Sequence, residues 1–522
     1  MEAPSNEVVG LHRTSSTISF GSINTRNVYK NFCKGLFGIG VTAEMIGQKE
    51  GEIHEIFKPS NTVTGGQIHD TIVGQGQLQE QGSNSSAKIS PIPTDRVLIS
   101  TNIRNRNRSR FSWIRPPPMD FIVGPLMLAA AEAGNLQRLI STLKYIRDIN
   151  VQDGWKETAL HKAADRGYKD IVQQLLMKGA STEAIDVFNV TPLHLAAENG
   201  HTSTVELLLI KGASIEAADY RDNTPLHFAA RNGHSSTVVL LLTKGAPIEA
   251  MNHNNNTPLY LAASNGHVST VKLLLTNGAS IEVSNYENNP LHLAASNGHT
   301  RTVELLLAKG ASINITNHCN NTPLHLAASK GHTSTVELLL MKGASIDVTN
   351  YCNNTPLHLA ASKGHTSVVK LLLMKGASIE ATNYSYNTPL HFAARGGYTS
   401  TVELLLIKGA LIEATSNSNN TPLHLAARGG YTSTVELLLT KGASIEATNY
   451  SYNTPLHLAA RGGYISTVEI ILMKGASIEI MNEDNNTPLH LAAQGGRTDV
   501  VKLLESRAVK PALLGRMRTL FG

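Results

Sequence analysis

The 522-residue sequence contains only three cysteines, few aromatic residues and no long apolar run. Three cysteines, an odd and low number, exclude a disulfide-rich scaffold and favour a reducing compartment. Aromatic residues make up 5% of the chain, which favours closely stacked helices over a bulky core. The longest apolar stretch, GLFGIGV at 35–41, is far shorter than the roughly 18 residues of a membrane helix. The N-terminal sequence MEAPSNEVVG lacks the basic and apolar regions of a signal peptide. We therefore expect a cytoplasmic protein without a transmembrane segment.

The sequence also lacks the short motifs that mark common catalytic and cofactor sites. It contains no phosphate-binding glycine loop, no paired CxxC, no HExxH and no GxSxG. The net charge of +5 is small for this length and by itself predicts no partner. We expect a protein that is not an enzyme and that binds no cofactor and no metal ion. An enzyme with an unrecognised N-terminal fold is the catalytic alternative that the sequence leaves open.

What the sequence does contain is a repeat of about 33 residues. Thr-Pro-Leu begins at residues 191, 224, 257, 322, 355, 388, 421, 454 and 487. A variant of the triplet begins at Thr158, Asn289 replaces the threonine in another unit, and a divergent first unit begins at Pro125. Twelve units are thus predicted within 125–510, beginning near 125, 158, 191, 224, 257, 289, 322, 355, 388, 421, 454 and 487.

Within one unit, the pattern predicts two short helices and a loop. Thr421 suits the N-cap of the first helix, and Pro422 suits its first position, where a backbone N–H has no helical partner. In the following STVELLL segment, Val435 and Leu438 share one apolar face of a second helix, which Gly442 can end in a left-handed conformation. One helix pair cannot bury its apolar face alone, whereas stacked pairs share a continuous core. The sequence therefore predicts an all-α solenoid.

The 33-residue period, TPLHLAA, the NGH turn, VELLL and the KGA ending resemble the ankyrin repeat. The resemblance covers about three quarters of the chain and recurs in register. It implies an ankyrin-repeat α-solenoid, in which helix pairs carry protruding β-turn fingers that recognise other proteins.

The fingers depart from the family pattern two residues before the threonine, where glycine is usual. Asparagine, the next-best residue for a left-handed turn, occupies most of these positions. Tyr386 and Tyr452 suit such a turn less well, so the sequence predicts these two fingers less firmly. The positions are Asn189, Asp222, Asn255, Asn320, Asn353, Tyr386, Asn419, Tyr452 and Asn485.

Ten of the twelve units place a histidine directly after the Thr-Pro-Leu position. Equivalent atoms in neighbouring units are a whole repeat apart, whereas two zinc ligands each lie about 2 Å from one ion. Tyr260 and Met127 fill the same position in the other two units. The resemblance implies a structural role, in which the imidazole bonds to the threonine hydroxyl and to nearby loop backbone. A second set of histidines, in the turn between the helices, interchanges with tyrosine, as suits turn packing.

The fingertips are the first candidate binding surface. Four positions before the threonine, most units carry tyrosine or histidine, which offer a large rigid contact area with a polar tip. The alternative is that duplication copied a harmless tyrosine, because residues 375–440 and 441–506 are near-copies. The candidates are Tyr220, His253, Tyr286, His318, Tyr351, Tyr384 and Tyr450.

Two rows of charged side chains are further candidates for a binding surface. An acidic row at the base of the fingers would repel phosphate. A basic row ends the first helices, where cations also suit the helix dipole. Together the rows predict a groove with an acidic and a basic edge, which prefers a protein of mixed charge over nucleic acid. The acidic row is Glu183, Glu216, Glu249, Glu282, Asp347, Glu380, Glu413, Glu446 and Glu479. The basic row is Arg231, Lys330, Lys363, Arg395, Arg428 and Arg461, of which Arg395, Arg428 and Arg461 are the candidates for partner binding.

Residues 1–115 form a low-complexity N-terminal region that differs in kind from the repeats. Gly, Asn, Gln and Ser dominate residues 62–86, which predicts a largely disordered segment. QIHDTIVGQGQLQ is vaguely similar to Gln-flanked amyloid signalling motifs but lacks their core order. The basic segment 104–115 is either a solvated linker or a segment that binds nucleic acid, an anionic membrane or an import receptor. A Pro-rich linker is predicted at 116–124 and a short tail at 511–522.

The leading hypothesis is a monomeric, non-enzymatic scaffold or adaptor that binds protein partners through the fingertips and the concave groove. Near-identical fingers favour an extended or repetitive partner, because several equal contacts add through effective concentration. The alternative is a signalling or effector protein whose N-terminal segment carries the output and whose repeats only target it.

Overall fold

The computed structural model describes residues 119–285 and 287–507. The predicted N-terminal region, the tail at 511–522 and Tyr286 lie outside the described residues. The first helices of the repeats are α3 (Met119–Glu132), α5 (Ala159–Arg166), α7 (Pro192–Glu198), α9 (Pro225–Arg231), α11 (Pro258–Ser264), α13 (Pro290–Ser296), α15 (Pro323–Lys330), α17 (Pro356–Ser362), α19 (Pro389–Arg395), α21 (Pro422–Arg428), α23 (Pro455–Gly462) and α25 (Pro488–Gln494). The second helices are α4 (Leu136–Thr142), α6 (Lys169–Met177), α8 (Thr202–Ile210), α10 (Ser235–Thr243), α12 (Val268–Thr276), α14 (Thr300–Ala308), α16 (Thr333–Met341), α18 (Thr366–Met374), α20 (Thr399–Ile407), α22 (Thr432–Thr440) and α24 (Ile465–Met473), followed by helical residues 498–507.

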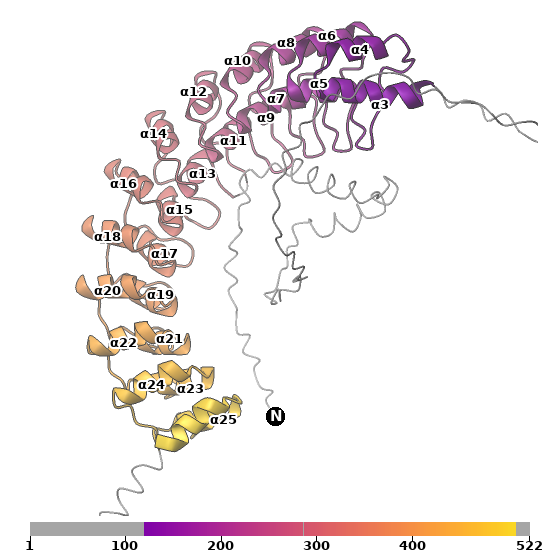
Figure 1. Cartoon of the computed structure of the whole chain (residues 1–522). Coiled ribbons are helices and arrows are strands. Elements are labelled where there is room, and N and C mark those ends of the chain that lie inside the picture. Colours follow the sequence, from indigo (N-terminus) through magenta and orange to yellow (C-terminus); the bar gives the residue numbers. More distant parts are fainter. Residues whose placement is uncertain (1–118, 286, 508–522) are drawn as a thin grey trace, which may run out of the picture. The chain divides into compact units, whose positions relative to one another are not determined.

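The helices form twelve consecutive pairs, which confirms the predicted repeats. From α5 to α23, each first helix packs against the second helix of its own repeat and against the first helices before and after it. Figure 1 shows the two resulting layers, with α5, α7 and α9 in one and α6, α8 and α10 in the other. Within the described residues there is no β-strand, and Gln152 and Thr158 form an isolated antiparallel bridge. The predicted all-α solenoid is therefore present.

Small and branched apolar side chains fill the space between the layers. In the repeat that begins at 421, the first helix contributes Leu423, Ala426 and Ala427, and the second contributes Val435 and Leu438. All five side chains are 0% exposed. Burial of a valine or leucine side chain stabilises a fold by roughly 1.5–3 kcal/mol. The alanines add little area, but they let neighbouring first helices approach closely, so the core continues from one repeat to the next.

The first repeat begins differently from the prediction. The sequence places its start at Pro125, after a Pro-rich linker at 116–124, but α3 already begins at Met119 and contains Pro125 in its interior. The other first helices start at a threonine or asparagine N-cap, and no such residue precedes Pro125. Without that N-cap, the helix extends further toward the N-terminus.

A ladder of hydroxyl groups links consecutive second helices. Thr202 Oγ1 lies 2.9 Å from Thr237 Oγ1, and Thr300 Oγ1 lies 2.8 Å from Thr335 Oγ1. The ladder is interrupted where Val268 stands in place of a hydroxyl residue. There the buried Thr302 Oγ1 has no hydrogen-bond partner. The remaining pairs are Ser235–Thr270, Thr366–Thr401, Thr399–Thr434 and Thr432–Thr467.

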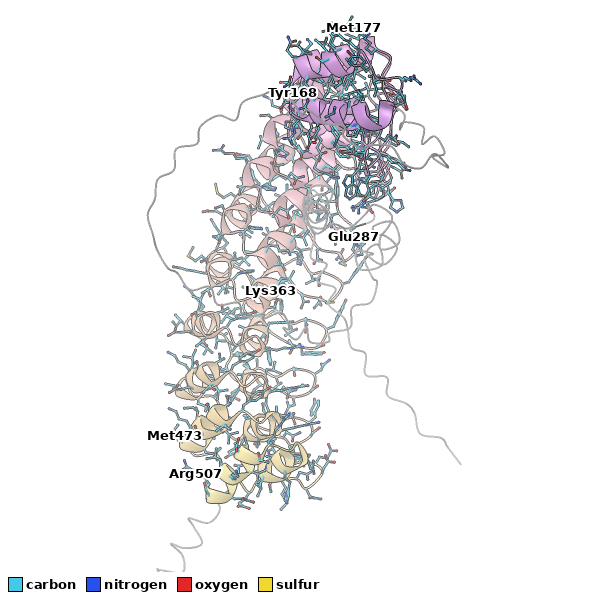
Figure 2. All side chains as sticks on the ribbon, turned by 45° about the vertical axis from the view of Figure 1, so that its right-hand side comes forward. Tyr168, Met177, Glu287, Lys363, Met473 and Arg507 are labelled. Atoms are coloured by element: carbon cyan, nitrogen blue, oxygen red, sulfur yellow. The ribbon has the colours of Figure 1, made fainter. Side chains whose placement is uncertain are left out.

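Among the described residues, six second helices end on a large, exposed apolar side chain. Met177 in α6 and Met473 in α24 are 65% and 63% exposed, and they lie near the two ends of the array (Figure 2). A lysine follows each of the six residues, where a cation is favourable against the helix dipole. We call this row the second-helix edge. Its other members are Ile210, Met341, Met374 and Ile407.

Among the described residues, ten fingers have a left-handed residue with a φ of 54–58°, whichever residue type fills that position. Tyr386 has a φ of 54°, close to the 55° of Asn419. In the same finger, Asn383 Oδ1 accepts hydrogen bonds from the N–H groups of Ser385 at 2.9 Å and Asn387 at 3.0 Å. These bonds hold the turn, although a left-handed tyrosine costs roughly 1–2 kcal/mol. The two tyrosine fingers, which the sequence predicts less firmly, are therefore as regular as the others.

Candidate partner-binding surface

The repeated histidines join the N-cap of one repeat to the finger of the next. The backbone N–H of Thr421 donates to His424 Nδ1 at 3.1 Å, and the backbone N–H of His424 donates to Thr421 Oγ1 at 3.4 Å. His424 Nε2 donates to the carbonyl oxygen of Asn453, one repeat further on, at 3.0 Å. Both ring nitrogens are therefore used inside the fold, and the structural role of the histidines is confirmed. The same link to the following repeat is made by His161, His194, His227, His292, His325, His358, His391 and His457.

Burial keeps these imidazoles uncharged. It lowers the pKa of five of them to about 4, and the hydrogen bonds to backbone carbonyls oppose this shift only in part. The five are His227, His292, His325, His358 and His424. A neutral ring that donates at Nε2 and accepts at Nδ1 has no free lone pair for a metal ion. Among the described residues, no group of three or more His, Cys, Asp or Glu side chains could hold a metal ion.

The second set of histidines packs against glycine in the preceding turn. His234 Nε2 donates to the carbonyl oxygen of Glu198 at 2.8 Å. A Cβ on Gly200, which has a φ of 70°, would lie only 2.5 Å from His234 Nδ1. Tyr398 takes the place of the histidine against Gly364 in the same way. This contact confirms the predicted turn packing and explains why the turn glycine cannot carry a side chain.

Backbone hydrogen bonds connect the tips of neighbouring fingers. The N–H of Tyr384 donates to the carbonyl oxygen of Cys352 at 3.3 Å, and the N–H of Tyr450 donates to that of Ser418 at 3.1 Å. In the same way, the N–H of His253 donates to the carbonyl oxygen of Arg221 at 2.8 Å. From Tyr351 to Glu483, each tip is thus held by the finger before it, and these fingertips form a row of fixed spacing.

Most of the predicted fingertip side chains are exposed on this row. Tyr351, Tyr384 and Tyr450 are 67%, 69% and 70% exposed. His253 and His318 are exposed as well. Tyr386 and Tyr452, which we did not predict as binding residues, add two further rings that are each 60% exposed. At this position the sequence pattern draws attention to the left-handed backbone, and it does not indicate that the two rings are exposed.

Tyr220 differs from the other fingertip tyrosines because its ring packs against its neighbours. Its centroid lies 5.6 Å from that of Phe188, and the Arg221 guanidinium carbon lies 5.0 Å from the Tyr220 centroid. Burial raises the pKa of its phenol, and the tyrosine is 44% exposed. Tyr220 therefore offers less free surface to a partner.

Asparagine side chains tie the bases of the fingers together, a feature that the sequence analysis missed. Asn350 Nδ2 donates to Asn321 Oδ1 of the preceding repeat at 2.9 Å. The signal was the asparagine that directly precedes the N-cap residue in nine units, which the repeat pattern alone does not require. The other pairs are Asn252–Asn223, Asn285–Asn256, Asn317–Asn288, Asn449–Asn420 and Asn482–Asn453.

The acidic row makes structural contacts as well. Glu249 Oε1 accepts a hydrogen bond from the backbone N–H of Ser280, one repeat further on, at 2.7 Å. Asn314, the exception in the row, accepts the same bond from Ser345 through Oδ1 at 3.0 Å. Glu183, Glu282, Asp347, Glu380, Glu413 and Glu446 make equivalent bonds. These carboxylates therefore hold neighbouring loops together, a role that their charge alone did not predict.

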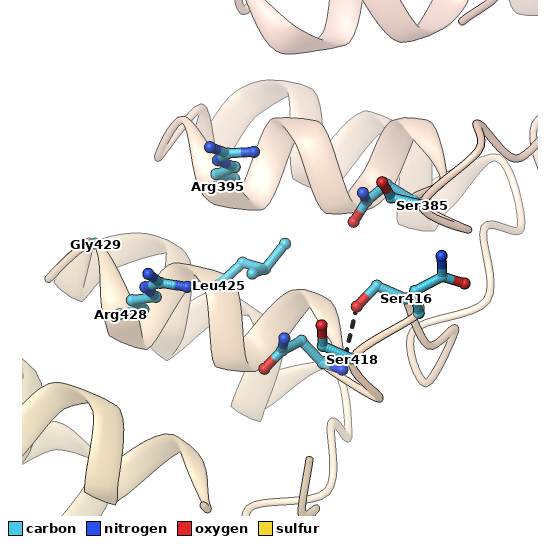
Figure 3. A pocket seen from close by; sticks show the side chains of 10 residues that line it. Ser385, Arg395, Ser416, Ser418, Leu425, Arg428 and Gly429 are labelled. Carbon is cyan, nitrogen blue, oxygen red and sulfur yellow. Dashed lines mark hydrogen bonds between the residues drawn. The ribbon is translucent and has the colours of Figure 1, made fainter. Parts of the chain in front are cut away.

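Arg395 and Arg428 line one hollow between the fingers and the first helices. Figure 3 shows the two side chains on consecutive first helices, with Leu425 beside Arg428 and with Ser385, Ser416 and Ser418 on the finger side. Ser416 Oγ accepts a hydrogen bond from the backbone N–H of Asn420 at 3.2 Å, which holds that finger in place. Arg461 is exposed at the equivalent position of the next repeat. Arg395 and Arg428 thus lie on the helix side of this hollow.

A family model matches the repeats of this chain. The family described as ankyrin repeats in three copies matches residues 126–219, 226–317, 291–383, 380–449 and 446–512. The ankyrin repeat domain of human ASB11 is 28% identical, with a TM-score of 0.39, and the match covers 42% of this chain and 98% of that domain. The 60 kDa lysophospholipase of Mus musculus is 42% identical over 60 residues, which are 12% of this chain and 11% of that protein. The chain thus matches about a tenth of the length of this relative.

Within residues 119–285 and 287–507, which the structure describes, no helix is long and apolar enough to cross a membrane. Ankyrin repeats are generally non-catalytic, and they indicate a protein–protein interaction domain. Both the helix pairs and the family match extend from the first described repeat to the last. The chain belongs to the ankyrin repeat family.

Proposed function

We propose that this protein is a non-enzymatic scaffold or adaptor that binds partner proteins through its fingertips and the groove beside them. The row of exposed tyrosines on fingers joined by backbone hydrogen bonds carries this proposal. Rigid aromatic side chains on a fixed row lose little conformational entropy when they bind. Several similar fingers also favour an extended or repetitive partner.

A capture experiment with the full chain tests the proposal. The bait proteins are the wild type and the triple variant Tyr351→Ala, Tyr384→Ala, Tyr450→Ala. Each bait is incubated with a cytosolic extract, and the captured proteins are identified by mass spectrometry. We expect the wild type to retain a partner that the fingertip variant loses. Because the three rings are exposed, the thermal midpoint of the variant should stay close to that of the wild type.

The second-helix edge supplies a matched control. Met341, Met374 and Ile407 are 71%, 60% and 67% exposed, similar to the three tyrosines, but they lie on the second helices. Replacing these three residues by alanine should leave capture of the partner intact. A fingertip variant that captures the same partners as the wild type would refute the fingertip proposal.

We further propose that the protein acts as a monomer in the cytoplasm. Cys319 and Cys352 are free thiols, which suits a reducing compartment. Deleting residues 1–115 tests the role of the repeats against the effector alternative. The scaffold proposal expects the shortened chain to keep its partner and its cellular output. Loss of output with intact partner binding would favour the effector alternative.

A further inference from the structure

The groove beside the fingers carries charge of one sign over five consecutive repeats. Its walls are the fingers 317–321, 350–354, 383–387, 416–420 and 449–453 and the first helices α15, α17, α19, α21 and α23, and together they contain no aspartate or glutamate. Each repeat adds one exposed cation at or directly after the end of its first helix. We call this surface the basic groove. Its cations are Lys330, Lys363, Arg395, Arg428 and Arg461.

These five cations are not neutralised by neighbouring carboxylates of the described residues. None of the ion pairs there involves them. In the same repeats, the carboxylates of Asp347, Glu380, Glu413 and Glu446 accept hydrogen bonds from loop N–H groups of the next repeat. Acidic finger residues appear only beyond the ends of the basic groove, and the nearest are Glu287 before it and Glu483 and Asp484 after it. The groove is therefore a positive surface with defined ends.

The floor of the basic groove is apolar and partly open. One leucine or phenylalanine per first helix, directly after the buried histidine, is half-buried between the fingers and the cations. Leu425 lines the hollow together with Arg395 and Arg428 (Figure 3). The row of floor residues is Leu326, Leu359, Phe392, Leu425 and Leu458. A ligand in this groove meets an apolar and a cationic contact in every repeat.

The spacing of these contacts matches one conformation of an extended chain. Packed helices lie roughly 8–10 Å apart. A polyproline II helix has three residues per turn and rises about 3.1 Å per residue, so equivalent side chains recur about every 9 Å. Side chains at every third residue would therefore meet the same contact in successive repeats. The bonds between neighbouring fingertips, such as that from Tyr450 N–H to the Ser418 carbonyl oxygen, keep this spacing fixed.

We propose that the basic groove binds an acidic segment of a partner protein in the polyproline II conformation, with a carboxylate at every third residue. Resting on the proposed function, this inference specifies the class of partner. The carboxylates pair with the lysine and arginine side chains, and arginine can bind a carboxylate through two parallel hydrogen bonds. Apolar side chains between them lie on the leucine and phenylalanine floor. Tyr384 and Tyr450 flank the segment from the finger side.

Two synthetic peptides of identical composition test the spacing. The first contains five Glu-Pro-Leu triplets, and the second places its five glutamates consecutively before the same prolines and leucines. Both carry fluorescein, and binding to the full chain is measured by fluorescence anisotropy. The triplet peptide should bind about tenfold more tightly, and added salt should weaken its binding because the pairs are solvent-exposed. Equal affinities, or no binding of the triplet peptide at millimolar concentration, would overturn the proposal.

Two variants with the same change in net charge locate the site. The groove variant is Arg395→Gln, Arg428→Gln, Arg461→Gln, and the control is Lys342→Gln, Lys375→Gln, Lys408→Gln at the ends of the second helices. The groove variant should weaken binding of the triplet peptide by about tenfold or more, and the control by less than about twofold. Equal effects of the two variants would contradict binding in the groove. Tighter binding of an oligothymidylate than of the triplet peptide would assign the groove to nucleic acid and would overturn the proposal.

Failure of this inference can be told apart from failure of the proposed function. Partner capture through the fingertips is measured with natural proteins and with the tyrosine variant. If the peptides do not bind but the tyrosine variant still loses its partner, only the acidic-segment inference is wrong. If the tyrosine variant keeps all its partners, the proposed function is wrong as well.

Discussion

Acidification from pH 7 to pH 5 should destabilise the repeat array through its buried histidines. In the folded chain the pKa of His227, His292, His325, His358 and His424 is about 4, against an ordinary value of 6.5. The unfolded chain therefore binds more protons between pH 6.5 and pH 4. The free energy of unfolding is fully retained above this window and falls as the pH falls through it.

The size of the effect follows from the two pKa values. At pH 5 the unfolded imidazole is largely protonated and the folded one is largely neutral. Over the roughly 1.5 pH units between the unfolded pKa and pH 5, the free energy of unfolding falls by about 1.4 kcal/mol per unit. The total loss at pH 5 is about 2 kcal/mol for each histidine. Below pH 4 the folded ring also takes up a proton, and the loss levels off near 3 kcal/mol for each histidine. Five histidines make this a large effect for an array whose repeats stabilise one another.

The assay is urea unfolding of the full chain, followed by circular dichroism at pH 7, 6, 5 and 4. His325→Tyr provides a matched variant, because Tyr260 already fills the equivalent position and its hydroxyl accepts a hydrogen bond from Asn285 Nδ2 at 2.7 Å. Between pH 7 and pH 5 this variant should lose about 2 kcal/mol less than the wild type. A stability that stays constant down to pH 5, or the same loss in both proteins, would refute the reasoning.

Three further predictions concern the contacts between repeats. Val268→Thr should give the buried Thr302 hydroxyl its missing partner and raise the free energy of unfolding by about 1 kcal/mol; an unchanged urea midpoint would contradict the hydroxyl ladder. Gly200→Ala should lower the thermal midpoint more than Gly212→Ala, because a Cβ at 200 meets a histidine ring at 2.5 Å and one at 212 meets nothing within 4 Å; equal shifts would contradict the turn packing. Glu249→Gln should keep the bond to the next loop, whereas Glu249→Ala should cost about 1 kcal/mol; equal urea midpoints of the two variants would show that the bond does not stabilise the array.

Much of the fold follows from the sequence because the same local signals recur in most of the twelve units. A hydroxyl N-cap such as Thr421, a proline after it and a left-handed glycine such as Gly442 set the helix boundaries in most units. The first helix is the exception, because Pro125 is not preceded by such a cap and lies inside α3. A boundary that depends on a missing signal cannot be predicted from the pattern of the other repeats.

Less of the candidate site could be predicted from the sequence. Exposed fingertips at Tyr351, Tyr384 and Tyr450 follow from their place in the repeat. The role of the acidic row does not, because the bond from Ser280 N–H to Glu249 joins residues 31 positions apart. Such bonds depend on the distance between neighbouring loops, which the repeat period alone does not provide.

Photo-crosslinking from a fingertip tests the central claim most directly. The photoreactive amino acid p-benzoylphenylalanine replaces Tyr384 in one variant and Met374, on the second-helix edge, in another. Both residues are exposed, at 69% and 60%, but Tyr384 lies on the finger row. The account predicts that irradiation in cells yields a specific protein adduct from position 384 and none from position 374. The same adducts from both positions, or an adduct from position 374 alone, would contradict partner binding through the fingers.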